Sequence, residues 1–117
     1  MQKAKVMQLF RLFAFLDDAR PYEDLADAAM LRVTAMLKPD ADPDDVRLCY
    51  YAAAEANLQY RRLLAAGTVT PTYAGSAAGT RADTEQCTLA ERLAAAYRSA
   101  AAELLRDEGF VFAAISS

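Results

Sequence analysis

The sequence predicts a mainly α fold, a single domain of 117 residues built from four helices. The first observation is a run between Pro43 and Gly67 that contains neither glycine nor proline and is rich in alanine and leucine. The second is that apolar residues recur at intervals of three and four in several segments, as on one face of an α-helix. The third is the composition, because 55% hydrophobic residues, many of them alanine, with 25% charged residues favour a globular helical chain.

We expect the longest helix at residues 43–66 and regard it as the element that the other helices pack against. Asp42 is placed to cap it, Pro43 to occupy its first helical position and Gly67 to end it. Its apolar face is predicted to hold Val46, Tyr50, Ala53, Asn57, Tyr60 and Leu64. Asn57 interrupts this face, either as a buried residue whose hydrogen bonds fix the helix register or as a contact with another subunit.

Two shorter helices are predicted before it, at residues 2–18 and 22–38, separated by Pro21 and ended by Pro39. The apolar face of the first includes Phe10 and Phe13. The simpler interpretation is that this face belongs to the core. The alternative is that part of it forms a contact between subunits.

The pattern changes after Gly67. Residues 67–87 show no helical stripe, and we expect an extended insert there. Thr88 followed three residues later by Glu91 is a capping-box pattern, so the fourth helix is predicted at 88–108. The apolar tail at 110–117 could contribute a strand, and segments 68–73 and 110–115 could pair as a short β-ribbon. No helical face buries the large side chains of these two segments. These segments contribute Tyr73, Phe110, Phe112 and Ile115 as candidate interface residues, and the intersubunit alternative for the first helix adds Phe10 and Phe13.

The sequence offers little for catalysis. Histidine is absent, which removes the commonest general base near neutral pH and the commonest metal ligand. Cys49 and Cys87 have no histidine partner, so we expect thiols without a catalytic role. Asp40, Asp42 and Asp44 alternate as at the start of a calcium-binding loop, but the glycine and glutamate that such a loop needs are missing, and capping is the preferred interpretation. We predict no cofactor, no metal and no enzymatic activity.

The net charge of −3 is unevenly spread, with seven acidic and two basic residues between positions 21 and 45. No basic cluster is large enough to neutralise a phosphate backbone, so we expect no nucleic-acid binding. Arg11 breaks the apolar run near the N-terminus, acids replace a signal-peptide cleavage site, and no run is long enough for a membrane span. We expect a soluble protein that is neither secreted nor membrane-bound.

The predicted parts follow a particular order. A helix ending at Leu37-Lys38-Pro39 precedes an acidic start to an Ala- and Tyr-rich helix; a Thr- and Gly-rich insert, a capped Ala- and Leu-rich helix and a Phe110–Phe112 tail follow. This layout, over residues 22–115, resembles the small helical head–tail connector or adaptor proteins of tailed bacteriophages and prophages. The resemblance implies a structural assembly protein without catalytic residues, whose copies form a ring beneath the portal. Its partners would be itself and other phage structural proteins such as the portal, in the bacterial cytoplasm or the virion. The alternative is a small cytosolic bacterial helical-bundle protein that binds a partner protein through the 2–18 helix.

Overall fold

The computed structural model describes residues 1–68 and 74–106; at Thr68 and over residues 74–82 the description covers the helical backbone only. Within these residues the α-helices are α1 (Lys3–Phe13), α2 (Glu23–Ala35), α3 (Val46–Thr68) and α4 (Ala74–Ala100). Two short 3₁₀ turns, η1 (Arg20–Tyr22) and η2 (Ala102–Leu104), precede α2 and follow α4. The predicted mainly α fold with four helices is confirmed.

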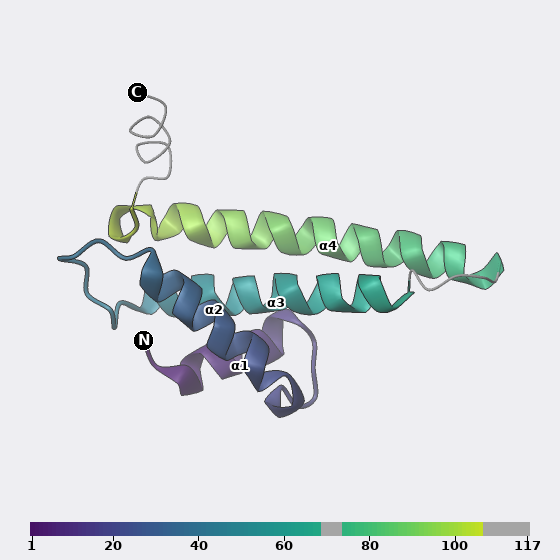
Figure 1. Cartoon of the computed structure of the whole chain (residues 1–117), viewed down its shortest axis with the longest axis horizontal. Coiled ribbons are helices and arrows are strands. Elements are labelled where there is room, and N and C mark those ends of the chain that lie inside the picture. Colours follow the sequence, from purple (N-terminus) through teal and green to yellow (C-terminus); the bar gives the residue numbers. More distant parts are fainter. Residues whose placement is uncertain (69–73, 107–117) are drawn as a thin grey trace, which may run out of the picture.

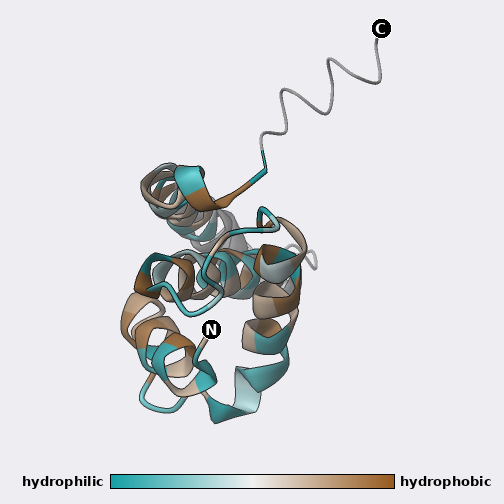
Figure 2. Cartoon of the chain, turned by 90° about the vertical axis from the view of Figure 1, so that its left-hand side faces the viewer, coloured by the Kyte–Doolittle hydropathy of each residue, from teal (hydrophilic) through white to brown (hydrophobic). Residues whose placement is uncertain are grey.

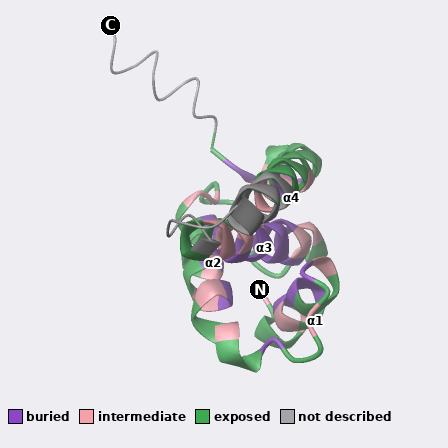
Figure 3. Cartoon of the chain, turned by 90° about the vertical axis from the view of Figure 1, so that its right-hand side faces the viewer, coloured by how far each residue is buried: buried purple, intermediate pink, exposed green. Residues whose placement is uncertain are grey.

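The helix α3 is the element around which the others pack, since it contacts α1, α2 and α4. The antiparallel α4 lies along one side of it, and α1 and α2 lie on the other side (Figure 1). The part of α3 between Leu48 and Tyr60 is mostly buried, whereas most of the described part of α4 is exposed (Figure 3). Hydrophilic residues, teal in Figure 2, make up most of the connections between α1, α2 and α3. The predicted role of the 43–66 helix as the organising element is therefore confirmed.

The core is built from few large side chains and many alanines. Alanine lets helices approach closely, because it presents no bulk beyond Cβ. The main cluster of buried residues comes from α1, α2, α3 and the segment after α4; among its members are Val6, Phe10, Ala26, Ala29, Val33, Leu48, Tyr51, Ala52, Ala56, Tyr60 and Leu105. A second cluster holds α3 against α4 and consists of Ala54, Leu58, Ala90 and Ala94.

The first helix ends at Phe13, five residues before the predicted end at residue 18. The backbone N–H of Leu16 donates to the Arg11 carbonyl at 3.0 Å, and that of Phe15 donates to the Leu12 carbonyl at 3.3 Å. These two hydrogen bonds form a Schellman motif, in which the residue after the C-cap adopts the left-handed conformation. That residue is Phe15, with φ of 56°. Because glycine is usual at this position, the sequence contains no signal for the stop.

The third helix begins at Val46 rather than at residue 43. Its capping residue is Asp45, whose carboxylate accepts the Arg47 backbone N–H at 2.9 Å. Asp42 accepts the Asp44 backbone N–H at 2.9 Å and so stabilises the preceding turn instead of the helix. Any of several consecutive acids can cap the start of a helix, and the conformation of the preceding turn determines which of them does. The predicted cap residue is therefore wrong: Asp45 caps α3, Asp42 accepts a bond within the turn, and Asp44 pairs with the N-terminal amine.

The third helix continues through Gly67 to Thr68, so the predicted stop at Gly67 is wrong. The fourth helix begins at Ala74, and the predicted extended insert at 67–87 is therefore wrong for residues 67, 68 and 74–87. Thr88 lies inside α4, where its hydroxyl donates to the Thr84 carbonyl at 3.1 Å. Because a threonine hydroxyl inside a helix can also donate to the carbonyl of the preceding turn, the Thr88–Glu91 pattern does not by itself mark a helix start. The helix ends at Ala100, before the predicted residue 108. The chain then returns to α2, where the backbone N–H of Arg106 donates to the Met36 carbonyl at 2.8 Å.

The remaining predictions about segments concern residues without a structural description. The β-ribbon between 68–73 and 110–115, and the tail at 110–117, lie almost entirely outside the described residues, apart from Thr68 at the end of α3. Among the described residues the one β-type pairing is an isolated bridge between Leu37 and Leu105.

Candidate functional site

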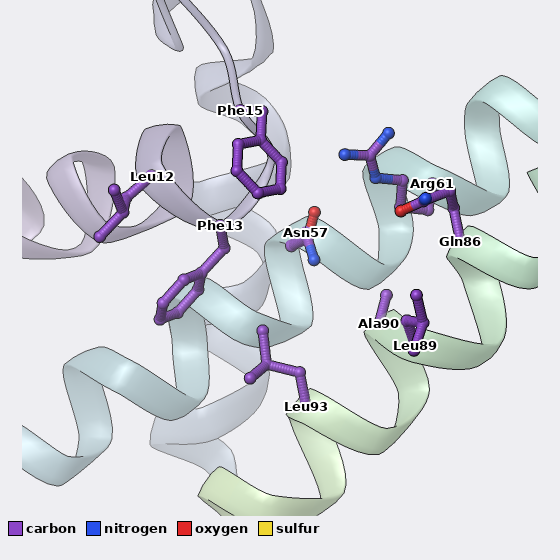
Figure 4. A pocket seen from close by; sticks show the side chains of 9 residues that line it. All are labelled: Leu12, Phe13, Phe15, Asn57, Arg61, Gln86, Leu89, Ala90 and Leu93. Carbon is purple, nitrogen blue, oxygen red and sulfur yellow. The ribbon is translucent and has the colours of Figure 1, made fainter.

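An apolar groove of about 500 Å³ lies where the C-terminal end of α1 meets α3 and α4 (Figure 4). Three helices contribute to it because α1 ends above the middle of the α3–α4 pair. Its lining residues are Leu12, Phe13, Phe15, Asn57, Arg61, Gln86, Leu89, Ala90 and Leu93. We call this surface the α1–α4 groove.

The rim of the α1–α4 groove exposes large apolar side chains. Phe15 is 87% exposed, Leu12 62% and Leu89 54%. Scattered exposed apolar residues are normal on a protein surface, but a cluster around a concave site indicates a binding surface. Phe13 is only half-exposed and stacks on Tyr97, so it belongs to the floor of the groove rather than to its rim.

Phe15 is held at this rim by a strained backbone. A residue other than glycine in the left-handed conformation costs about 1–2 kcal/mol, because its Cβ approaches the carbonyl oxygen. The cost is offset elsewhere in the fold, since Phe15 itself buries little surface. Strained residues of this kind concentrate at functional sites. The strain and the exposure of Phe15 therefore point to the same surface.

Asn57 contributes an unsatisfied hydrogen-bond acceptor to the wall of the groove. The residue is 4% exposed, and its Oδ1 has no hydrogen-bond partner among the described residues. In Figure 4 this oxygen is turned toward the side on which Phe15 and Arg61 lie. A buried polar atom without a partner costs about 1–3 kcal/mol. A donor supplied by a bound molecule would remove this cost.

Arg61 is the charged residue among those that line the groove. Its guanidinium donates to the Ala14 carbonyl at 3.1 Å and lies 5.4 Å from the centre of the Tyr60 ring. The carbonyl of Ala14 is one that the end of α1 leaves without a helical donor. Arginine stays protonated, so it can attract an acidic partner but cannot act as a general base. The groove can thus bind apolar groups, a hydrogen-bond donor and a nearby negative charge.

The predicted interface residues fall into three groups. Phe10 is fully buried with its ring edge-on to Tyr60, which corresponds to the core interpretation of the first helix. Phe13 lines the groove. The others lie outside the described residues: Tyr73, Phe110, Phe112 and Ile115.

Sequence reasoning did not single out Leu12, Phe15 or Leu89 as site residues. A helix to residue 18 would have left Phe15 on the flank of a buried face, and the stop at Phe13 instead turns it outward. The predicted helix start at Thr88 likewise placed Leu89 in a first turn, where nothing indicated that it would line a groove. Asn57 carried a signal, because a polar residue within an apolar stripe must be satisfied by the core or by a partner.

A second group of charged residues joins the start of α3 to η2. Arg47 pairs with Asp45 at 2.9 Å and also with Glu103. The side-chain and backbone hydrogen bonds from Arg47 lower the pKa of Asp45 to about 2. Asp45 also caps α3, so this group has a structural explanation.

None of the helices in the described ranges is both long and apolar enough to cross a lipid bilayer. No family model, no curated protein and no solved structure matches this chain.

Proposed function

We propose that this chain is a structural, protein-binding subunit that self-associates and has no catalytic activity. The observation that carries the proposal is the rim of the α1–α4 groove, where Phe15 is exposed in a strained conformation beside Leu12 and Leu89. Exposed apolar surface of this kind is favourable only when another molecule covers it. In this proposal, the covering molecule is a further copy of the same chain.

The chemistry of the groove supports binding rather than catalysis. Proton transfer needs a titratable group whose pKa lies near the working pH. Among the lining residues the titratable side chain is Arg61, which stays charged. The other polar members, Asn57 and Gln86, have amide side chains that form hydrogen bonds but do not exchange protons at neutral pH.

The type of assembly we propose is a head–tail connector or adaptor of a tailed phage, acting in the bacterial cytoplasm and the virion beside proteins such as the portal. The order of helices that the structure retains, α2 before Pro39, the Ala- and Tyr-rich α3 and the Ala- and Leu-rich α4, supports it, and so does an exposed apolar groove among the described residues. Genes for portal and capsid proteins next to the gene for this chain would support this assignment. A neighbourhood without them would count against it.

A second candidate is a small helical-bundle protein that binds a different protein through the end of the 2–18 segment. The specific observation in its favour is that Leu12, Phe13 and Phe15 all belong to that segment. The two candidates use the same groove but differ in the state of the purified chain. Self-association predicts oligomers of the chain alone, and the second candidate predicts a monomer.

Sedimentation velocity over a wide concentration range tests the proposal. We expect the wild-type chain to form oligomers and Phe15→Ser to shift it toward the monomer. The matched control is Leu31→Ser, because Leu31 is a 73% exposed apolar residue of α2 that does not line the groove. Circular dichroism would confirm that both variants fold. A wild-type chain that is monomeric throughout would refute self-association, and equal behaviour of the two variants would refute the groove as its surface.

A further inference from the structure

The α1–α4 groove sets two requirements for whatever occupies it. The occupant must cover the apolar rim at Leu12, Phe15 and Leu89. It must bring a hydrogen-bond donor to the buried Oδ1 of Asn57. A segment of polypeptide with apolar side chains meets both requirements, because each of its residues other than proline also carries a backbone N–H.

This chain contains such a segment beyond its described residues. Phe110 to Ile115 reads Phe-Val-Phe-Ala-Ala-Ile, with no charge and no proline. Asp107 and Glu108 precede it. Arg61 is the charged residue that lines the groove, whereas the adjoining hollow holds both Arg92 and Glu85. The acids before the segment are thus complementary in charge to Arg61.

The position of Arg106 favours a second copy over the same chain as the source of the segment. The chain follows η2 past the end of α4 (Figure 1), and the backbone N–H of Arg106 then donates to the Met36 carbonyl at the end of α2. The groove residue Ala90 lies ten residues before the end of α4 at Ala100, which corresponds to about 15 Å of helix.

The reach of the chain can be compared with that distance. Phe110 is four residues beyond Arg106 and reaches at most about 14 Å from it. Within one chain, therefore, the first residues of the segment reach mainly the end of the groove nearest Ala100, and the later residues could arrive at its middle. A second copy is not subject to this limit, because its position can bring the whole segment to the groove.

We infer that the α1–α4 groove binds the segment Phe110–Ile115 of a second copy, with a backbone N–H of that segment donating to Asn57 Oδ1. This inference rests on the proposed self-association and names its two surfaces. The groove and the segment are different parts of the chain, and each copy offers one of each. Such contacts close as a reciprocal two-fold dimer or extend into a ring or an open chain.

Two variants of the full-length chain test this arrangement by complementation. Leu89→Arg blocks the groove and leaves the segment intact; Leu89 is exposed on α4, so the substitution leaves the core unchanged. Phe110→Ser with Phe112→Ser disables the segment and leaves the groove intact. In sedimentation velocity, we expect oligomers for the wild type, a reciprocal dimer or larger, and monomers for each variant alone. An equimolar mixture should give a dimer and nothing larger, because it has one working contact.

The other outcomes separate this inference from the proposed function. If the wild type associates and the segment variant associates equally well, the segment is not the occupant, although self-association stands. If both variants are monomeric and their mixture stays monomeric too, the groove and the segment do not bind each other. A wild-type chain that is monomeric throughout overturns both the inference and the proposed function.

Asn57→Leu tests independently whether a backbone N–H of the segment donates to Asn57 Oδ1. The leucine keeps approximately the shape of the asparagine but removes the acceptor. We expect association about tenfold weaker than in the wild type, as for the loss of one buried hydrogen bond. Unchanged association in a folded Asn57→Leu variant would exclude the hydrogen bond to the segment.

Discussion

Phe13 and Tyr97 stack with their ring centroids 5.6 Å apart and their planes inclined by 20°. Phe13 is the last residue of α1, and Tyr97 lies in the last turn of α4. The ring of Tyr97 also lies 5.3 Å from that of Tyr50 on α3. Three helices that are distant in sequence therefore meet at Tyr97, next to the floor of the α1–α4 groove.

We expect the effects of substituting Phe13 and Tyr97 on the free energy of unfolding to be coupled. In a double-mutant cycle with Phe13→Leu and Tyr97→Leu, the coupling free energy should be about 1 kcal/mol, as for other aromatic pairs. Chemical denaturation of the four proteins measures it. Leu31→Ala combined with Tyr97→Leu is the control and should be additive. Additive effects for Phe13 and Tyr97 as well would show that the two rings merely lie close together.

Tyr60 should be among the residues that contribute most to stability. It is buried, with its ring centroid 6.2 Å from Phe10 and 4.9 Å from Tyr22. Tyr60→Ala should lower the free energy of unfolding by about 2–4 kcal/mol, since it leaves a cavity between α1, η1 and α3. Leu63→Ala, at an exposed position of the same helix, should change it by less than about 0.5 kcal/mol. A similar small change for Tyr60→Ala in urea denaturation would contradict the described core.

Phe15→Gly should stabilise the fold and weaken association. Glycine adopts the left-handed conformation without the Cβ clash, so the free energy of unfolding should rise by about 0.5–1 kcal/mol. Phe15→Ala is the matched control, because it removes the same ring and keeps the clash. Thermal and urea unfolding would separate the two variants. A glycine variant no more stable than the alanine variant would mean that residue 15 is not strained.

The ion pair between Asp45 and Arg47 should make stability depend on pH in the acid range. The pKa of Asp45 is lowered from 3.8 to about 2 in the folded chain, chiefly by the Arg47 side chain. A lowered pKa in the folded state gives a stabilisation that is present above pH 3.8 and lost as the pH falls toward 2. The advantage of the wild type over Arg47→Gln should therefore shrink across this range.

Carboxyl-carbon NMR titration provides the direct measurement for Asp45. In Arg47→Gln we expect its pKa to return toward 3.8, and in the control Arg92→Gln we expect it to stay near 2. An unchanged Asp45 titration in Arg47→Gln would show that the ion pair is not formed in solution.

The sequence predicted the buried faces of the helices better than the ends of the helices. The stripe that includes Ala53, Asn57 and Tyr60 is buried as expected, because its spacing matches the helical repeat in any surroundings. Val46 at the start of that stripe is 53% exposed. A stripe shows which side of a helix is apolar, whereas the length of the neighbouring helices decides how much of that side is covered.

The sequence by itself determined the helical class, the three-four spacing of the core and the central role of α3, since these follow from local periodicity and composition. Only the tertiary structure decided where α1 stops, where α4 starts and which acid caps α3. Each of those choices is between local states of similar free energy, and packing or a few hydrogen bonds select one of them. The α1–α4 groove belongs to this second kind of information. It exists because α1 ends in a left-handed turn at Phe15 over the middle of two other helices, a juxtaposition that no single segment encodes.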